Sequence, residues 1–332
     1  MRRCLSLAHE LDVAEAEIAF FARDLGIDYP IIDASPWALV TLSAPPGDAS
    51  IDSSIAHAQW AGVAQRADAE EFCAAAQDFG PDLVIVDHYA FDAGWHDAVR
   101  ARLGCRIVAI DDLADRRMAV DDNFHEDHRA KYAPVLGPDT PILGGPRYAL
   151  LDPVYADAPR YPFSPKVRSI GLFLGGSETG GRSVSIARAL RESGFEGSFA
   201  IVASSAGPNV AALKAAADSH QGIELQLDLP NLAGFFAAHD LQIGAGGGAT
   251  WERFCIGAPS ILLPFAQNQL TAIEPLAAKG VAQCMGADWT MPDLVGCVAG
   301  LIGDPARRQA MASAAARMVD GRGAQRVSDA IL

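Results

Sequence analysis

Short apolar runs that alternate with segments of helical periodicity constrain this chain more than any other feature. Clear runs occupy 81–87 and 105–110 in the first half and 169–174, 198–203 and 260–265 in the second. Continuous apolar runs of this kind are typical of strands buried on both faces, which occur in parallel sheets. Because parallel strands are joined by crossover helices, the alternation predicts an α/β protein with doubly wound sheets in both halves.

The chain is long enough to hold two such sheets. It has 332 residues, half of them hydrophobic, whereas a typical domain has ~150 residues. A Pro- and Tyr-rich run at 153–165 separates the halves, and we interpret it as a linker. We therefore expect an N-terminal domain over 1–150 and a C-terminal domain over 151–332, both Rossmann-like and facing each other across a cleft.

The charge balance and the cysteines indicate which classes of partner and which cellular compartment suit this chain. The chain has 26 basic and 41 acidic residues, a net charge of −15, which argues against nucleic acid and anionic membranes as partners but not against a small anionic ligand. No apolar run reaches the ~18 residues of a membrane span, and His9 and Glu10 interrupt the N-terminal apolar stretch too early for a secretory signal. The six scattered cysteines suit free thiols in a reducing cytoplasm.

A glycine-rich turn at 244–248 is the strongest candidate for a binding site. It follows the apolar run 240–243 and leads into a helical segment that contains Glu252. Glycines let the backbone approach a ligand closely, and the N-terminus of the following helix attracts a phosphate. Glu252 lies in the first helical turn, where its carboxylate would reach a ribose hydroxyl. The residues expected to bind here are Gly246, Gly247, Gly248, Thr250 and Glu252.

A second glycine turn, 175–181, follows another strand of the same half and contains Gly176 and Ser177. Neither turn has the GxGxxG or GxxxxGK[ST] spacing, and a single glycine turn in an α/β protein is as often structural as functional. Two such turns at one sheet edge, with Asn268 and Gln269 following a neighbouring strand, favour the diphosphate of a nucleotide.

The first half offers polar side chains at the ends of its strands. Asp87-His88-Tyr89 follows one strand, and 111–115, which contains three aspartates, follows the next. His88 is a candidate general base because its ordinary pKa is about 6.5; the alternative is a capping Asp with two packing rings. We interpret the aspartates as caps and the tract 121–128 as a solvated acidic loop, since neither has a metal-ligand spacing. Arg147 is a candidate for binding a phosphate or a sugar substituent.

Seven motifs in order give a specific resemblance to the PseG family, the UDP-2,4-diacetamido-2,4,6-trideoxy-β-L-altropyranose hydrolases of pseudaminic acid biosynthesis. The resemblance runs from Arg3 nearly to the end and is weak over 12–60. The motifs are Leu83-Val-Ile-Val-Asp-His-Tyr89, Ile110-Asp-Asp-Leu-Ala-Asp-Arg116, Leu143-Gly-Gly-Pro-Arg-Tyr-Ala-Leu-Leu151, Leu174-Gly-Gly-Ser177, Gly244-Ala-Gly-Gly-Gly-Ala-Thr-Trp-Glu-Arg253, Gln267-Asn-Gln269 and Asp320-Gly-Arg-Gly-Ala-Gln-Arg326.

The resemblance implies a GT-B fold, related to MurG-like glycosyltransferases, and a cytoplasmic UDP-sugar hydrolase that supplies flagellin glycosylation. It places UDP on the C-terminal domain, with the 244–248 turn at the diphosphate and Glu252 at the ribose. Asn268 would lie near the diphosphate or sugar, and Tyr89 would face the sugar from the other domain. The reaction would use water, invert the anomeric centre and need no metal or cofactor; the catalytic residues would be His88, Tyr89 and Asn268.

The start of the chain departs from this family, whose members begin with a strand and a GxGHxxRC motif carrying the proposed base. Here Arg3-Cys4 matches the end of that motif, and we expect the first strand and its histidine to be missing. One explanation, which we favour, is a start codon assigned too late. The other is a chain without the base, which would only bind nucleotide sugars unless His88 replaces it. A GT-B glycosyltransferase with a UDP-sugar donor is the alternative enzyme.

Overall fold

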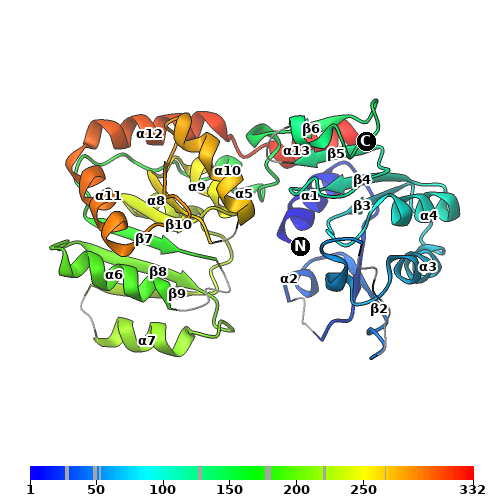
Figure 1. Ribbon diagram of the computed structural model, residues 1–332, viewed down its shortest axis with the longest axis horizontal. Helices are drawn as coiled ribbons and strands as arrows, with labels where there is room; N and C mark the ends of the chain where they lie inside the picture. Colours follow the sequence, from blue (N-terminus) through cyan, green and yellow to red (C-terminus); the bar gives the residue numbers. More distant parts are fainter. Residues whose placement is uncertain are drawn as a thin grey trace. The chain divides into compact units, whose positions relative to one another are not determined.

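The computed structural model describes residues 1–26, 30–47, 51, 54–125, 129–175, 181–219, 222–265 and 267–332. The chain forms two compact units, which we describe separately (Figure 1). Unit 1 contains Met1–Pro153 and Arg322–Leu332, and unit 2 contains Val154–Gly321. The chain passes from unit 1 to unit 2 between Pro153 and Val154, close to the expected domain boundary at 150. The last residues, which the sequence assigned to the second domain, pack instead with unit 1.

Unit 1 is built on a parallel four-stranded sheet with the order β3-β4-β5-β6. Alternate residues of β4 face opposite sides: Ile107 packs toward a core with helices α3 and α4, and Val108 toward a core with α1 and α13. The elements are β3 (Leu83–Val86), β4 (Arg106–Ile110), β5 (Asp122–His125), β6 (Ile142–Gly144), α1 (Arg2–Val13), α3 (Gln65–Ala76), α4 (Ala93–Leu103) and α13 (Gly323–Ile331).

Helix α13 belongs to unit 1 because of its apolar face. Val327 and Ile331 are buried against Leu7 and Leu11 of α1. No local pattern in the sequence indicates this partner, which lies more than 300 residues away in the chain. The expectation of a loop at 121–128 was also wrong in part, because strand β5 begins at Asp122. Asp122 pairs with Val108 of β4, and the Asp122 carboxylate lies 2.9 Å from Arg106 Nη2.

A second, two-stranded parallel sheet joins β1 (Ala19–Arg23) and β2 (Ala38–Leu42). Arg23 fixes this sheet to α3, since its Nη2 lies 2.8 Å from the buried Asp68 Oδ2. Asp68 Oδ1 also accepts a 2.9 Å hydrogen bond from Trp95 Nε1 on α4. The short helix α2 (Pro30–Asp33) and the 3-10 helices η1 (Ala58–Ala61), η2 (Arg129–Tyr132) and η3 (Pro146–Tyr148) complete the described elements of unit 1.

Unit 2 is a parallel six-stranded sheet with the order β12-β11-β10-β7-β8-β9, which confirms the doubly wound prediction. Helices flank both of its faces (Figure 1). The elements are β7 (Ser169–Phe173), β8 (Ser198–Ala203), β9 (Ile223–Leu227), β10 (Leu241–Ala245), β11 (Ser260–Leu263), β12 (Gln283–Cys284), α5 (Val154–Asp157), α6 (Arg182–Glu192), α7 (Val210–Ser219), α8 (Ala233–Ala238), α9 (Ala249–Ile256), α10 (Gln267–Ala278), α11 (Met291–Gly303) and α12 (Pro305–Met318).

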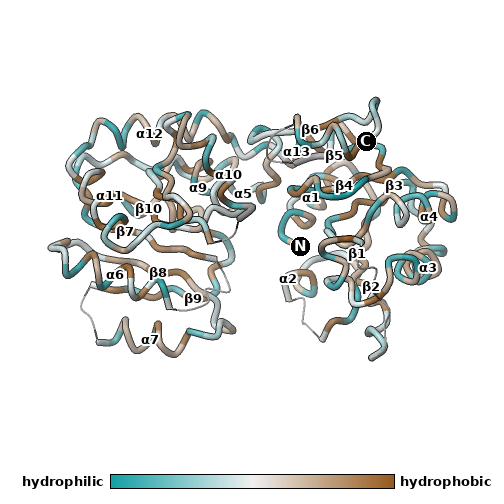
Figure 2. Tube along the Cα trace, viewed as in Figure 1, coloured by the Kyte–Doolittle hydropathy of each residue, from teal (hydrophilic) through white to brown (hydrophobic). Residues whose placement is uncertain are grey.

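The strand order places the candidate site. The chain winds outward from β7 in one direction and from β10 in the other, and these two strands pair directly, with Gly244 opposite Phe173. This is the switch point of the sheet, where open α/β sheets bind ligands at the carboxyl ends of strands. The hydrophobic residues follow the strands (Figure 2), and Leu172 and Ile243 are completely buried at the centre of the sheet.

Two further expectations concern the linker and membranes. The run 153–165 is not a free linker, because Tyr155 in α5 is only 3% exposed and packs within unit 2. Within the described ranges, no helix combines the length and hydrophobicity needed to span a bilayer.

Candidate functional site

The glycine turn after β10 is the centre of the candidate site in unit 2. Strand β10 ends at Ala245, and the helix α9 begins at Ala249. The turn between them is tight: the Thr250 amide donates to the Gly247 carbonyl over 2.9 Å, and the Trp251 amide donates to the Gly248 carbonyl over 3.1 Å. These bonds fix the turn at the N-terminal, positive end of the α9 dipole, which is where an anion binds to a helix.

Two glycines of this turn have different reasons to lack a side chain. A Cβ on Gly246 would lie 2.6 Å from Ile273 Cγ2, so the close packing of α10 requires glycine there. Gly248 is exposed, and a Cβ there would meet no atom within 4 Å. The outer side of the turn is therefore open to a ligand, while its inner side is closed by α10.

Gln269 lies beside the turn, as the sequence predicted. Its Oε1 accepts a 2.9 Å hydrogen bond from the Phe265 amide, which fixes the side chain at the end of β11. Its Nε2 would lie 3.9 Å from a Cβ on Gly247, so the amide group faces the turn. Of the other predicted residues, Gly176 and Ser177 lie outside the described residues, as does the side chain of Asn268.

Glu252 is held in place by a residue that sequence reasoning missed. The hydroxyl of Tyr155 donates to Glu252 Oε2 over 2.6 Å and accepts a 3.1 Å hydrogen bond from the Leu232 amide. Tyr155 is buried, and it fixes the carboxylate on the first turn of α9. A carboxylate fixed in this way is a preorganised acceptor for hydroxyl groups. The only sequence signal was an aromatic residue in a run interpreted as a linker.

Thr250 is turned into the protein. It is 2% exposed, its Oγ1 is 3.4 Å from the Ala245 carbonyl, and it accepts a 3.3 Å hydrogen bond from Arg253 Nη2. The expectation of a direct ligand contact is therefore replaced by a contact that holds the end of β10 against α9.

The second cluster of interest lies in unit 1, after β3 and β4. The Tyr89 hydroxyl donates to Asp112 Oδ2 over 2.6 Å and accepts a 3.2 Å hydrogen bond from Arg3 Nη2. Arg3 also lies 2.7 Å from Asp87 Oδ1 and 2.6 Å from Asp112 Oδ2. Burial favours the neutral form of Asp87, but the Arg3 guanidinium, the Met1 ammonium group and the Cys4 thiol together outweigh it and lower the pKa of that carboxyl group. Burial raises the pKa of Tyr89 well above its usual value.

An aromatic surface adjoins this cluster. Trp60 is 49% exposed, and its ring lies 4.4 Å from that of His57 and 5.9 Å from that of Tyr89. His57 Nε2 lies 3.6 Å from Asp115 Oδ2. An exposed ring beside carboxylates fits a ligand with one apolar face and several hydroxyl or amide groups. Trp60 and His57 lie in the weakly patterned part of the sequence, which gave no reason to single them out.

His88 and Arg147, two further predicted site residues, do not take part in the Arg3–Tyr89–Asp112 cluster. His88 Nδ1 accepts a 3.1 Å hydrogen bond from the Ala90 amide, and the ring also bonds to the Trp60 backbone. Burial lowers the pKa of His88, which favours the neutral ring. These contacts favour a structural role for this histidine. Arg147 has an exposed side chain, and its carbonyl accepts a 2.9 Å hydrogen bond from Arg326 Nη1.

The aspartates of unit 1 are used within the protein. Asp111 is completely buried; its Oδ1 lies 2.7 Å from Arg116 Nη1, and its Oδ2 accepts from the Leu113 and Ala114 amides. It caps the turn after β4, as the sequence suggested. Among the residues that the structure describes, no three His, Cys, Asp or Glu side chains are grouped so as to hold a metal ion.

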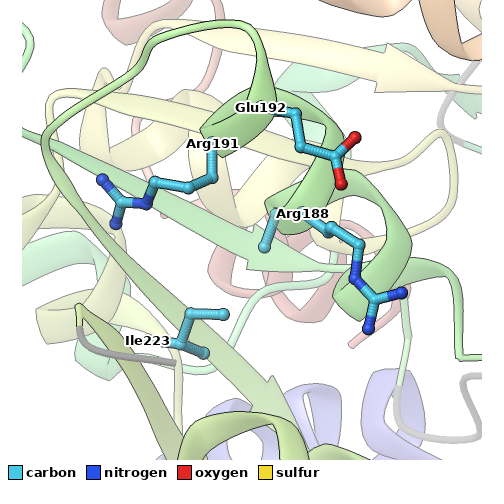
Figure 3. A pocket seen from close by; sticks show the side chains of 5 residues that line it. Arg188, Arg191, Glu192 and Ile223 are labelled. Carbon is cyan, nitrogen blue, oxygen red and sulfur yellow. The ribbon is translucent and has the colours of Figure 1, made fainter. Parts of the chain in front are cut away.

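A hollow of about 310 Å³ in unit 2 lies apart from the glycine turn. Figure 3 shows Arg188 and Glu192 of α6 on one side of it and Ile223 on the other. Ile223 is the first residue of β9, so this hollow lies at the amino ends of the strands. Arg191 is turned to the Phe195 and Gly197 carbonyls, 2.6 and 2.8 Å away. The hollow is therefore at the edge of the sheet where ligands are not expected.

Comparison with solved structures identifies the fold. No family model matches the chain. MurG from Acinetobacter baumannii superimposes with a TM-score of 0.69 at 15% identity, over 99% of this chain and 94% of MurG. The spinosyn forosaminyltransferase SpnP does so with a TM-score of 0.65 at 14% identity. The chain therefore has the two-domain GT-B fold, as the sequence predicted.

Sequence comparison finds relatives that include a glycosyltransferase of UDP-N-acetylglucosamine. The spore coat polysaccharide biosynthesis protein SpsG of Bacillus subtilis is 24% identical over 256 residues, 74% of this chain and 75% of SpsG. The UDP-N-acetylglucosamine--N-acetylmuramyl-(pentapeptide) pyrophosphoryl-undecaprenol N-acetylglucosamine transferase of Acidiphilium cryptum is 30% identical over 203 residues, 58% of this chain. The similarity spans about half of that transferase, 53% of its length.

Proposed function

We propose that this chain is an enzyme that binds a UDP-linked sugar on unit 2 and cleaves the bond between the sugar and UDP, transferring the glycosyl group to an acceptor. The observation that carries this proposal is the glycine turn at the switch point of the sheet, with Glu252 fixed beside it by Tyr155. The turn offers amides for a diphosphate, and the carboxylate offers an acceptor for ribose hydroxyls. Similarity to a UDP-N-acetylglucosamine transferase supports the choice of nucleotide.

The proposed chemistry needs little covalent participation by the protein. UDP leaves as a stable anion, so its departure depends mainly on stabilisation of the developing negative charge. The amides at the start of α9 would supply that stabilisation. We assign Gln269, Asn268, Gly176 and Ser177 to the surroundings of the diphosphate or sugar, and Arg147 to a phosphate or sugar substituent.

Transfer to an acceptor other than water is the favoured form of the reaction. The relative from Acidiphilium cryptum is an N-acetylglucosamine transferase, and solved structures with this fold include a forosaminyltransferase. Within unit 1, the Tyr89–Asp112 pair and the Trp60 ring combine hydrogen-bonding groups and an aromatic face, which suits a sugar. Hydrolysis is the second candidate, because the ordered motifs of the sequence, including Asp87-His88-Tyr89, resemble the PseG hydrolases of pseudaminic acid biosynthesis. Nucleotide-sugar binding without turnover is the third.

One assay separates these possibilities. The purified protein is incubated with UDP-N-acetylglucosamine and with the UDP-altropyranose derivative, each with and without candidate sugar acceptors, and UDP release is measured. Release that depends on the acceptor supports transfer, and equal release without it supports hydrolysis. Binding without release supports the non-catalytic alternative. Binding of neither donor by calorimetry would refute the UDP-sugar assignment.

The choice of site is tested separately. Glu252→Ala should weaken UDP binding about tenfold, since a hydrogen bond to a charged group contributes roughly 1.5 kcal/mol or more. Glu224→Ala is a matched control, because Glu224 is an exposed carboxylate on strand β9 of the same unit. Equal UDP affinity for the Glu252 variant and the control would remove Glu252 from the site.

A further inference from the structure

Arg253, one residue after Glu252, is a buried cation without a carboxylate partner. Its side chain is 0% exposed. Nη2 donates to the Ala245 carbonyl over 2.6 Å and to Thr250 Oγ1 over 3.3 Å. Within the described part of the chain, Nε and Nη1 have no hydrogen-bond partner, and no ion pair reaches this guanidinium. The neighbouring Glu252 is bonded to Tyr155 instead.

This arrangement is energetically costly. An ion taken out of water without full compensation costs several kcal/mol. Burial lowers the pKa of Arg253 to about 10, so the side chain still carries its charge at neutral pH. The Glu252 carboxylate attracts the guanidinium without forming an ion pair, and the Phe236 ring, 5.6 Å from the guanidinium carbon, adds weak compensation; together they do not offset burial.

Arg308 shows what a compensated buried arginine looks like in the same unit. It is also 0% exposed. Its guanidinium donates to the Leu301 and Ile302 carbonyls at the end of α11 and, over 2.7 Å, to the Pro165 carbonyl. The negative end of the α11 dipole therefore offsets that charge. Arg253 belongs to the last turn of α9, but its guanidinium reaches back to the Ala245 carbonyl and Thr250 Oγ1, beside the positive end of the helix, which adds to its cost.

The position of the Arg253 guanidinium connects it to the candidate site. A Cβ on Gly244 would overlap Nη1 of Arg253 and would lie 2.8 Å from the Phe173 carbonyl oxygen. Since Gly244 pairs with Phe173, the charge lies where β10 and β7 end side by side. It thus lies next to the start of the glycine turn, with Nη2 on the Ala245 carbonyl. Gly244 provides the space that the guanidinium occupies.

We infer that Arg253 provides the fixed positive charge that makes the glycine turn bind a diphosphate in preference to a neutral nucleoside. The inference rests on the proposed function and extends it, by assigning charge selectivity to a residue that does not touch the ligand. Arg253 is a positioning residue: its Nη2 holds the Ala245 carbonyl at the start of the turn, and its charge acts through protein of low dielectric, where screening by water is weak. A bound diphosphate would add negative charge near a guanidinium that forms no ion pair within the described ranges.

The test compares ligands of different charge on the whole protein. UDP, UMP and uridine are titrated by calorimetry into the wild type, Arg253→Met, Arg253→Gln and Arg253→Lys. We expect the two neutral variants to lose about tenfold or more of the UDP-to-uridine preference, a difference of about 1.4 kcal/mol, with uridine affinity nearly unchanged. Arg253→Lys should retain most of the preference. Arg308→Met is the control and should leave the ratio of affinities unchanged.

Stability provides a second readout. Replacing a buried, uncompensated charge by a hydrophobic residue of similar size commonly leaves a protein equally stable or more stable. Arg253→Met should therefore unfold at the same or higher urea concentration while its preference for UDP falls. A purely structural role predicts the reverse, a less stable protein with an unchanged ratio of affinities, and that result would overturn the inference. If Arg253→Met does not fold, the comparison of the Gln and Lys variants decides the question.

Pyrophosphate separates this inference from the proposed function. If the wild type binds pyrophosphate in a manner that depends on Arg253 but does not bind UDP, the diphosphate site stands and the UDP-sugar proposal falls. If UDP binds and the ratio of affinities is the same in all variants, the proposed function stands and the role of Arg253 falls. A wild type that binds neither UDP nor pyrophosphate refutes both.

Discussion

Removing the hydroxyl of Tyr155 should affect both the stability of unit 2 and its affinity for UDP. In Tyr155→Phe, Glu252 loses the donor 2.6 Å from its Oε2, and the buried Leu232 amide loses its acceptor at 3.1 Å. A hydrogen bond to a charged group contributes ~1.5–3 kcal/mol, and an unsatisfied amide costs ~1–3 kcal/mol. We therefore expect the free energy of unfolding to fall by about 3 kcal/mol, measured by urea denaturation.

The effect on binding follows from the mobility of Glu252. A carboxylate that is no longer held must be ordered when UDP binds, at a cost of about 1 kcal/mol, so the dissociation constant should rise about fivefold. Calorimetry with UDP measures this change.

The chain offers a matched control for this experiment. The hydroxyl of Tyr161 donates to Asp240 over 3.2 Å and accepts from the Ser164 amide over 3.1 Å, the same pattern near the amino ends of the strands. Tyr161→Phe should destabilise the protein by a similar amount and leave UDP affinity unchanged. A loss of less than about 0.5 kcal/mol in Tyr155→Phe, or an equal effect of both variants on UDP binding, would contradict the reasoning.

Three further predictions concern other contacts. Gly244→Ala should destabilise the protein by about 1–3 kcal/mol through overlap with Arg253, and combination with Arg253→Met should recover at least about 1 kcal/mol of this in a double-mutant cycle; additive effects would contradict the overlap. Trp60→Ala should lower the rate of UDP release from the UDP-sugar at unchanged UDP affinity, and a wild-type rate would exclude Trp60 from the sugar site. Because Arg3, the Met1 ammonium group and Cys4 together lower the pKa of Asp87 despite its burial, the wild type should lose stability below about pH 4, as Asp87 takes up a proton. In urea titrations at pH 6 and pH 3, Asp87→Asn should lose less stability on acidification than the wild type, and equal losses would contradict this.

The fold was largely predictable because its strands are continuous apolar runs. The run at 198–203 was predicted with the bounds that β8 has, and the run at 169–174 extends one residue beyond β7. Strand β5 was missed because it begins with polar residues; Asp122 is stabilised there by an ion pair with Arg106, which no local pattern indicates.

The candidate site was predictable only where it depends on local sequence. The glycine turn, Glu252 and Gln269 could be placed because a turn between a strand and a helix is set by neighbouring residues. Tyr155 and Trp60 could not, because their roles arise from contacts made across the folded unit. In the sequence Arg253 looks like an ordinary helical residue, and only the structure shows that its guanidinium is buried against Gly244 with Nε and Nη1 left without hydrogen bonds among the described residues.

The assignment of α13 to unit 1 has a consequence for synthesis on the ribosome. Residues 322–332 follow all of unit 2 in the chain, so Leu7 and Leu11 of α1 are made long before Val327 and Ile331, which cover them. Unit 2 is contiguous and can fold as soon as it emerges, whereas unit 1 must wait with an apolar helix face uncovered. In this interval the nascent chain offers a binding site for chaperones, and unit 1, although first in sequence, is completed last.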